Sequence, residues 1–80
     1  MNVVVDRSLA AEFFGSRETM ELTANSLFEL VGVLDAMAPG FAEIAPVRTA
    51  FAVDGNIVAD WSTSLRGASE VFLLPRIGGG

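Results

Sequence analysis

The sequence contains no cysteine, no histidine, no lysine and no tyrosine. Without a thiol or an imidazole, the chain lacks a cysteine nucleophile and the side chain that most often moves protons near neutral pH. It also lacks the soft ligands that zinc and copper prefer. Carboxylates are common in any acidic chain, so their presence alone does not indicate acid–base catalysis. We therefore predict no metal site, no bound cofactor and no enzyme activity of the chain by itself.

Positive charge is also scarce. Five arginines stand against ten acidic residues, which gives a formal net charge of −5. Such a chain repels phosphate backbones, so no nucleic-acid partner is expected, and its acids suit either solvation or docking on a basic protein. No apolar run approaches the ~20 residues that cross a bilayer, and the first residues do not resemble a leader peptide. These features predict a cytoplasmic protein without a membrane partner.

The chain does contain enough apolar material for one small domain. It has 80 residues, of which 51% are hydrophobic. A domain of this size buries about 60% of its unfolded surface around a single core. No internal repeat, low-complexity segment or linker interrupts it. We predict one domain over residues 1–75 and a flexible tail over residues 76–80.

The first half of the chain alternates strand-like and helix-like patterns. Three short segments precede the main helix, namely a β-branched strand at 3–5, a helical turn at 9–14 and a loosely alternating strand at 19–23. Ser26 and Glu29 fit a capping box, after which apolar residues follow helical spacing as far as Met37. Pro39 and Gly40 predict the end of this helix.

The second half reads as a hairpin followed by a last strand. We expect a loop through Pro46, and then a strand in which alternate residues face the core, namely Val47, Thr49, Phe51 and Val53. Asp54 and Gly55 predict a tight turn, because this pair readily adopts positive φ. A partner strand at 57–59, a polar loop with Trp61 and a strand at 70–74 follow. One main helix on one face of a mixed sheet of four to five strands is an α+β arrangement.

The last strand presents two different faces. Successive side chains of a strand point to opposite sides, so Phe72 and Leu74 lie on the uncovered face of the sheet if Val71 and Leu73 face the helix. An exposed apolar patch beside the end of the chain predicts a docking surface for a partner. The alternative is that Phe72 lies under the loop that carries Trp61.

The chain ends on three glycines, in the order Pro75, Arg76, Ile77, Gly78, Gly79, Gly80. A diglycine has no side chains, so it can pass along a channel only a backbone wide. A free α-carboxylate titrates near about 3.5, is therefore ionised at neutral pH, and needs activation by a nucleotide before acyl chemistry. The ending predicts a carrier whose working atom is the carbonyl carbon of Gly80. The alternative is a frayed terminus without a function.

Taken together, these residues resemble the ubiquitin-like sulfur carriers, the group that includes the small subunit of molybdopterin synthase and the sulfur carrier of thiamine biosynthesis. The resemblance covers the length, the order of the elements, the segment 51–55 and the ending. Members commonly close with a Glu-Val pair, an apolar strand, proline and Gly-Gly, as this chain does from Glu70 onward. Ala68 and Ser69 stand where the molybdopterin subunit usually has Gly-Asp, and Arg76 stands where a second proline is common.

The resemblance implies a ubiquitin-like β-grasp fold, with the first and last strands parallel and side by side. It implies that a ubiquitin-activating-type enzyme uses ATP to adenylate Gly80, and that a sulfur donor then converts the adenylate to a thiocarboxylate. Molybdopterin synthesis is the leading pathway, with the large subunit of molybdopterin synthase as acceptor. Gly78 and Gly79 would thread the tail, and the partner-binding residues would be Phe72, Leu74, Pro75, Arg76 and Ile77.

Two other functions remain open. In one, the adenylated Gly80 forms an isopeptide bond with a target lysine, which makes the chain a protein modifier. In the other, the protein is a non-catalytic binding module that uses the uncovered sheet face. Thiamine, cysteine and specialised-metabolite pathways also remain open for a sulfur carrier, because the partner selects the acceptor.

Overall fold

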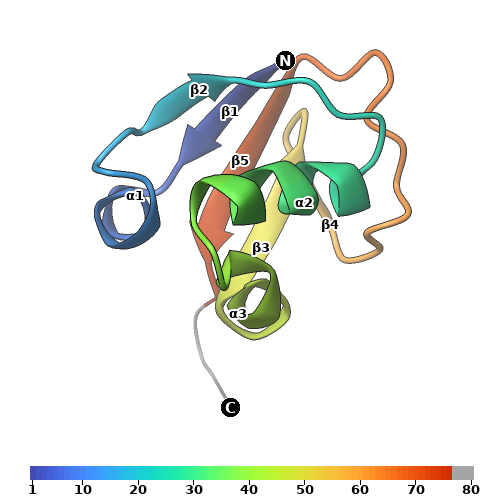
Figure 1. Ribbon diagram of the computed structural model, residues 1–80. Helices are drawn as coiled ribbons and strands as arrows, with labels where there is room; N and C mark the ends of the chain where they lie inside the picture. Colours follow the sequence, from blue (N-terminus) through green and yellow to red (C-terminus); the bar gives the residue numbers. More distant parts are fainter. Residues whose placement is uncertain (77–80) are drawn as a thin grey trace.

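The structure, a computed structural model, describes residues 1–76 and contains five strands and three helices within them (Figure 1). In chain order these are β1 (Asn2–Val5), α1 (Arg7–Phe13), β2 (Thr19–Glu21), α2 (Leu27–Met37), α3 (Phe41–Arg48), β3 (Thr49–Val53), β4 (Asn56–Val58) and β5 (Glu70–Pro75). The predicted α+β class is confirmed.

The five strands form one mixed sheet in the order β2-β1-β5-β3-β4. β1 and β5 lie parallel at its centre, with Val3 beside Val71 and Val5 beside Leu73. The other three pairings are antiparallel. A five-stranded mixed sheet with helices packed against it is the arrangement of a β-grasp-like fold, and the parallel first and last strands match the prediction.

The longest helix, α2, begins where the capping residue predicts. Ser26 has extended backbone angles, and its Oγ accepts a hydrogen bond from the Glu29 N–H at 3.2 Å. The N–H groups of Leu27 and Phe28 donate to carbonyl oxygens of the loop after β4, at 3.2 and 2.9 Å. Such bonds satisfy amides that a helix start otherwise leaves without partners. The start of α2 is therefore fixed both by its own cap and by that loop.

The prediction of a loop through Pro46 is wrong, because residues 41–48 form the helix α3. Asp35 of α2 accepts hydrogen bonds from the N–H groups of Gly40 and Ala42, at 3.1 and 2.9 Å, and so caps the start of α3 from the preceding helix. Phe41 and Ala45, one turn apart, are fully buried. The stabilisation from this burial and from the cap exceeds the cost of the backbone hydrogen bond that is missing at Pro46.

The α3 helix also changes where the next strand begins. Val47, which we expected in a strand, lies in α3 with 72% of its surface exposed. β3 starts at Thr49, whose hydroxyl donates to the Ala45 carbonyl at 2.6 Å. Thr49 and Phe51 are buried as predicted, so only the start of this strand was misplaced.

The turn between β3 and β4 is the predicted two-residue reversal. Asp54 and Gly55 both have positive φ, 46° and 89°, which is the geometry of a type I′ hairpin turn. β4 begins one residue earlier than expected, at Asn56. The Asp54 carboxylate accepts hydrogen bonds from the backbone N–H groups of Ser69 and Glu70, so the turn also holds the start of β5.

All three helices contribute to one core on one face of the sheet. Side chains of β1, β3 and β5 that alternate toward the helices are at most 2% exposed, namely Val3, Val5, Phe51, Val71 and Leu73. They join one cluster with buried residues of α1, α2 and α3. The other face presents a different apolar set, which we call the open face: Val4, Ala50, Ala52, Ile57, Phe72 and Leu74.

This register predicts opposite outcomes for neighbouring substitutions in β5. Leu73→Glu puts a carboxylate into the core, where an unpaired charge should cost about 4 kcal/mol or more and unfold this small domain. Leu74→Glu changes a half-buried side chain on the open face, and it should cost about 1 kcal/mol. Circular dichroism melting of both variants checks the difference. Equal melting temperatures would contradict the register of β5.

Candidate functional site

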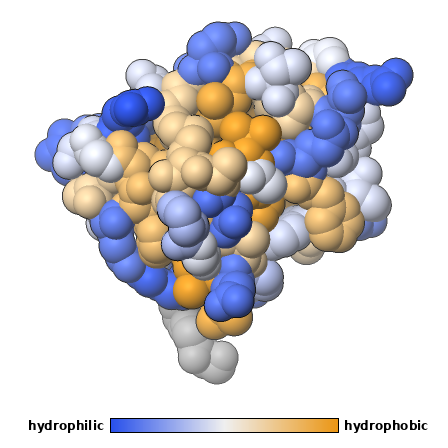
Figure 2. Space-filling view, in the orientation of Figure 1, coloured by the Kyte–Doolittle hydropathy of each residue, from blue (hydrophilic) through white to orange (hydrophobic). Residues whose placement is uncertain are grey.

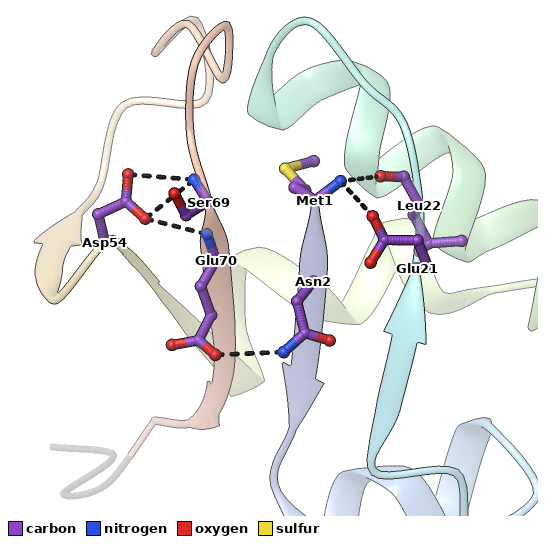
Figure 3. A network of polar contacts seen from close by, with 7 residues as sticks. All are labelled: Met1, Asn2, Glu21, Leu22, Asp54, Ser69 and Glu70. Atoms are coloured by element: carbon purple, nitrogen blue, oxygen red, sulfur yellow. Dashed lines mark hydrogen bonds and ion pairs between the residues drawn. The ribbon is translucent and has the colours of Figure 1, made fainter.

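A network of polar contacts anchors the start of β5 (Figure 3). The Asp54 carboxylate accepts from the Glu70 N–H at 2.9 Å, and the Glu70 side chain accepts from the Asn2 side chain at 3.2 Å. On the other side of β1, the amino group of Met1 donates to the Glu21 carboxylate and to the Leu22 carbonyl, each at 2.9 Å. The strands β1, β2 and β5 and the β3–β4 turn are therefore linked at the end of the sheet where β5 begins.

The other end of β5 is held by backbone contacts to α1 and α3. The Arg76 N–H donates to the Arg48 carbonyl at 2.8 Å, and the Asp6 N–H donates to the Leu73 carbonyl at 2.9 Å. Pro75 lies opposite Thr49 in the ladder with β3. In Figure 1, this end of β5 lies beside α3, at the opposite end of the sheet from the N-terminus. The chain therefore reaches Arg76 at a fixed point.

An ion pair joins the two helices beside this point. The Arg48 guanidinium donates two hydrogen bonds to the Glu12 carboxylate, at 2.8 and 2.7 Å, and lies 5.6 Å from the centre of the Phe13 ring. A two-point guanidinium–carboxylate contact fixes orientation as well as distance. The hydrogen bonds from Arg48 hold the pKa of Glu12 below its usual value of 4.5. We call this ion pair the α1–α3 clamp.

The open face is apolar along one row that crosses the sheet. Val4, Phe72, Ala52 and Ile57 are successive cross-strand neighbours on β1, β5, β3 and β4, and Leu74 lies opposite Ala50 in the next row. Toward the start of β5, the neighbouring row is polar, because Asn2 lies between Glu21 and Glu70. The open face is therefore an apolar strip with carboxylates along one edge.

The residues predicted to bind a partner fall into two groups. Phe72, Leu74 and Pro75 are half-buried in β5, and Arg76 is exposed directly after it. Ile77, Gly78, Gly79 and Gly80 lie outside the described residues, as does most of the predicted tail. Four of the predicted partner-binding residues therefore lie close together, in β5 or directly after it. They are Phe72, Leu74, Pro75 and Arg76.

Trp61 lies on the side of the sheet opposite Phe72. Its ring makes edge contacts with Phe28 and Phe51, at 5.7 and 6.0 Å between ring centres, and it packs against the core. Phe51 faces the helices, whereas Phe72 alternates with core residues toward the open face. The alternative in which the Trp61 loop covers Phe72 is therefore wrong.

Sequence reasoning missed an ion pair near the end of β5 and the exposure of two apolar side chains of α2. The α1–α3 clamp was not predicted because Arg48 was expected in a strand, and because no local pattern relates Arg48 to Glu12, which lies 36 positions earlier. The apolar residues that follow helical spacing in α2 end on Met37, which is 39% exposed, and Phe28 of the same helix is 62% exposed. Figure 2 shows the helix-covered side of the molecule, where hydrophobic residues reach the surface among hydrophilic ones.

Comparisons with known proteins add no assignment. No family model matches the sequence, and no curated protein matches it. Within residues 1–76, the structure contains no group of three or more carboxylate, cysteine or histidine side chains arranged to hold a metal ion. None of the described helices has the length and apolar character needed to cross a membrane. Function must therefore be inferred from the fold and from the residues around β5.

The α1–α3 clamp predicts a pH-dependent contribution to stability. Because the pKa of Glu12 is lowered in the folded state, its contribution is present above the usual glutamate pKa of 4.5 and is lost as the pH falls through the folded-state value. Glu12→Gln should therefore melt slightly below the wild type at pH 7, and the difference should disappear under acid conditions. Thermal melts across this pH range measure it.

The matched control makes the same change in an Arg48→Gln background. There, Glu12→Gln should have no effect that depends on pH, because the partner of Glu12 is absent. A difference that persists in acid, or that survives in the Arg48→Gln background, would contradict the clamp.

Proposed function

We propose that this protein is a sulfur carrier whose C-terminal glycine is adenylated and then converted to a thiocarboxylate for cofactor biosynthesis. One observation carries the proposal most strongly. The glycine-rich ending follows a central strand that is held at both ends, by the Asp54 and Glu70 contacts at its start and by the Arg48 carbonyl at Arg76. A tail that leaves a rigid domain at a fixed point can be presented to a partner in a defined direction.

The chemistry proceeds on the partner enzyme. A carboxylate oxygen of Gly80 bonds to the α-phosphorus of ATP and pyrophosphate leaves, which gives a mixed anhydride. A donor then supplies sulfur at the oxidation level of sulfide, which attacks the carbonyl carbon. The bond to AMP breaks, AMP leaves, and a thiocarboxylate remains on Gly80. The chain has no cysteine, so this sulfur is carried only at the terminus and not on a side-chain thiol. ATP is a substrate of the partner and not a cofactor of this chain.

The open face supplies the binding energy in this proposal. Ordering residues 77–80 in a partner's channel would cost roughly 1 to 2 kcal/mol for each residue, and glycines make few contacts that offset this cost. Phe72 and Leu74 expose part of their surface beside the start of the tail, together with Ile57 on the edge strand. An apolar strip with Glu21 and Glu70 along one edge is complementary to an apolar partner surface that has a basic margin.

The resemblance in length and overall pattern favours molybdopterin synthesis, with the large subunit of molybdopterin synthase as acceptor. A protein modifier that forms an isopeptide bond with a target lysine requires the same adenylation step and differs in its product. A binding module that uses only the open face requires no chemistry at Gly80. Tracing the sulfur and deleting Gly80 separate these three functions, and a second experiment tests the docking surface.

The first experiment follows the sulfur. Incubated with its cognate activating enzyme, ATP and a sulfur source, the protein should gain the mass that corresponds to one oxygen replaced by sulfur, on its C-terminal peptide. Intact-protein and peptide mass spectrometry measure this change. A lysine conjugate instead would identify a modifier, and sulfur at any other position would contradict the carrier.

Deletion of Gly80 separates chemistry from folding. The reaction should be abolished, while the melting temperature should change little, because the last core residue of β5 is Leu73. A truncated protein that keeps its full activity would favour the binding module.

The second experiment tests the open face. Leu74→Glu should weaken binding to the activating enzyme by about tenfold to a hundredfold, because the carboxylate would be desolvated in the interface. Met37→Glu is the matched control, since Met37 is an exposed apolar residue of α2 on the helix-covered side. It should leave the affinity unchanged. Titration calorimetry measures both, and equal losses would contradict docking through the open face.

A further inference from the structure

A groove of about 420 Å³ lies beside β3 and β4, away from the centre of the open face. Phe28 of α2, Ile57 of β4 and Trp61 of the following loop line its apolar part. Phe28 and Ile57 are 62% and 68% exposed, which is unusual for side chains of this size. The groove is therefore an accessible apolar surface at the edge of the open face, with which it shares Ala50 and Ile57.

The walls of the groove are held in place. The Phe28 N–H donates to the Trp61 carbonyl at 2.9 Å, and the Trp61 ring meets the rings of Phe28 and Phe51 edge-on. The loop itself is closed by the Asp60 carboxylate, which accepts from the Ser62 N–H at 2.9 Å and from its hydroxyl at 2.7 Å. A wall that is already fixed loses little entropy when a ligand binds.

Two opposite charges line the groove from opposite sides of β3. Asp60 follows β4 and Arg76 follows β5, and both residues contribute to its lining. The hydrogen bonds from Ser62 lower the pKa of the Asp60 carboxyl, so this group is ionised at neutral pH. A complementary ligand therefore carries a basic group on the side of Asp60, an acidic group on the side of Arg76 and an apolar group between them.

A second copy of this chain fits the groove poorly. Antiparallel pairing of two β4 edges around Ile57 would place Asp54 of each copy opposite Asp60 of the other. Like charges that face each other across two strands are destabilising, and each copy already carries a net charge of −5. Charge complementarity thus favours a different protein as the occupant.

We propose that this groove binds a short segment of a partner protein in which an apolar side chain lies between a basic and an acidic side chain. The apolar side chain contacts Phe28, Ile57 and Trp61, the basic one meets Asp60, and the acidic one meets Arg76. All of these groove residues belong to the described part of the chain. The proposal therefore does not depend on the chemistry of Gly80, and either can fail without the other.

The test uses the intact protein and a defined peptide. The probe is an acetylated and amidated pentapeptide of lysine, alanine, leucine, alanine and glutamate, which contains no tryptophan. Trp61 is the one tryptophan of the protein, so its fluorescence reports on the groove alone. Saturable changes in Trp61 emission are expected, together with amide shifts in nitrogen–proton spectra confined to the groove residues.

Two altered peptides test the two parts of the recognition. Glutamine at both charged positions should weaken binding by about threefold to tenfold, the range expected for two exposed ion pairs. Serine in place of leucine should weaken it by about tenfold or more, because the apolar contact is lost. Equal binding of all three peptides would overturn the proposal.

Variants of the protein complete the test. Ile57→Ala should weaken the binding of the leucine peptide several-fold, whereas Val47→Ala, at a similarly exposed position outside the groove, should not. Asp60→Asn keeps acceptors for Ser62, and it should make the protein indifferent to whether the peptide carries lysine or glutamine. Circular dichroism confirms that each variant is folded.

Three further outcomes would overturn the proposal. The first is unchanged Trp61 emission and unchanged amide spectra at millimolar peptide. The second is equal losses in Ile57→Ala and Val47→Ala. The third is a dimer of the protein alone, seen by sedimentation and dissociated by Ile57→Ala, which would assign the groove to a second copy of the chain.

Discussion

The parallel pairing of β1 with β5 places the first and last strands side by side at the centre of the sheet, and the other elements are arranged around that pair. Val3, Val5, Val71 and Leu73 form the floor of the core on which the helices pack. Parallel neighbours cannot be joined by a tight turn, so the helices and the β3–β4 hairpin lie in the connection between them. The sheet is therefore complete only when β1 and β5 have paired, and this pairing fixes the position of the end of β5.

Both ends of β5 are tied to elements that are distant in sequence. At its start, the Asp54 carboxylate accepts hydrogen bonds from the N–H groups of Ser69 and Glu70. Asp54 therefore both forms the β3–β4 turn and anchors β5. At its end, the carbonyl of Arg48 holds Arg76, while the side chain of Arg48 joins α3 to α1. The proposed carrier function needs this rigidity, because a partner must find the tail at a reproducible place.

The open face and the groove beside Trp61 differ in their chemistry. The open face is an apolar strip with carboxylates along one edge, which is suited to a broad interface with the folded surface of an enzyme. The groove is concave, has walls held by hydrogen bonds and carries charges of both signs, which is suited to a short segment with a defined pattern. The two surfaces share Ala50 and Ile57, and their other residues belong to different parts of the molecule, so one molecule offers both kinds of contact.

The sequence by itself determined the α+β class, the strands at both ends, the capped start of α2, the hairpin turn and the alternation that separates Leu73 from Leu74. These features follow from local rules such as side-chain periodicity, capping and positive φ. Only the tertiary structure decided that residues 41–48 are helical, because the cap comes from Asp35 and burial of Phe41 outweighs the proline. It also decided the ion pair of Arg48 with Glu12 and the place of Trp61 beside Phe28. The Arg48–Glu12 and Trp61–Phe28 contacts join residues that are far apart in the sequence, so they exist only once the chain has folded.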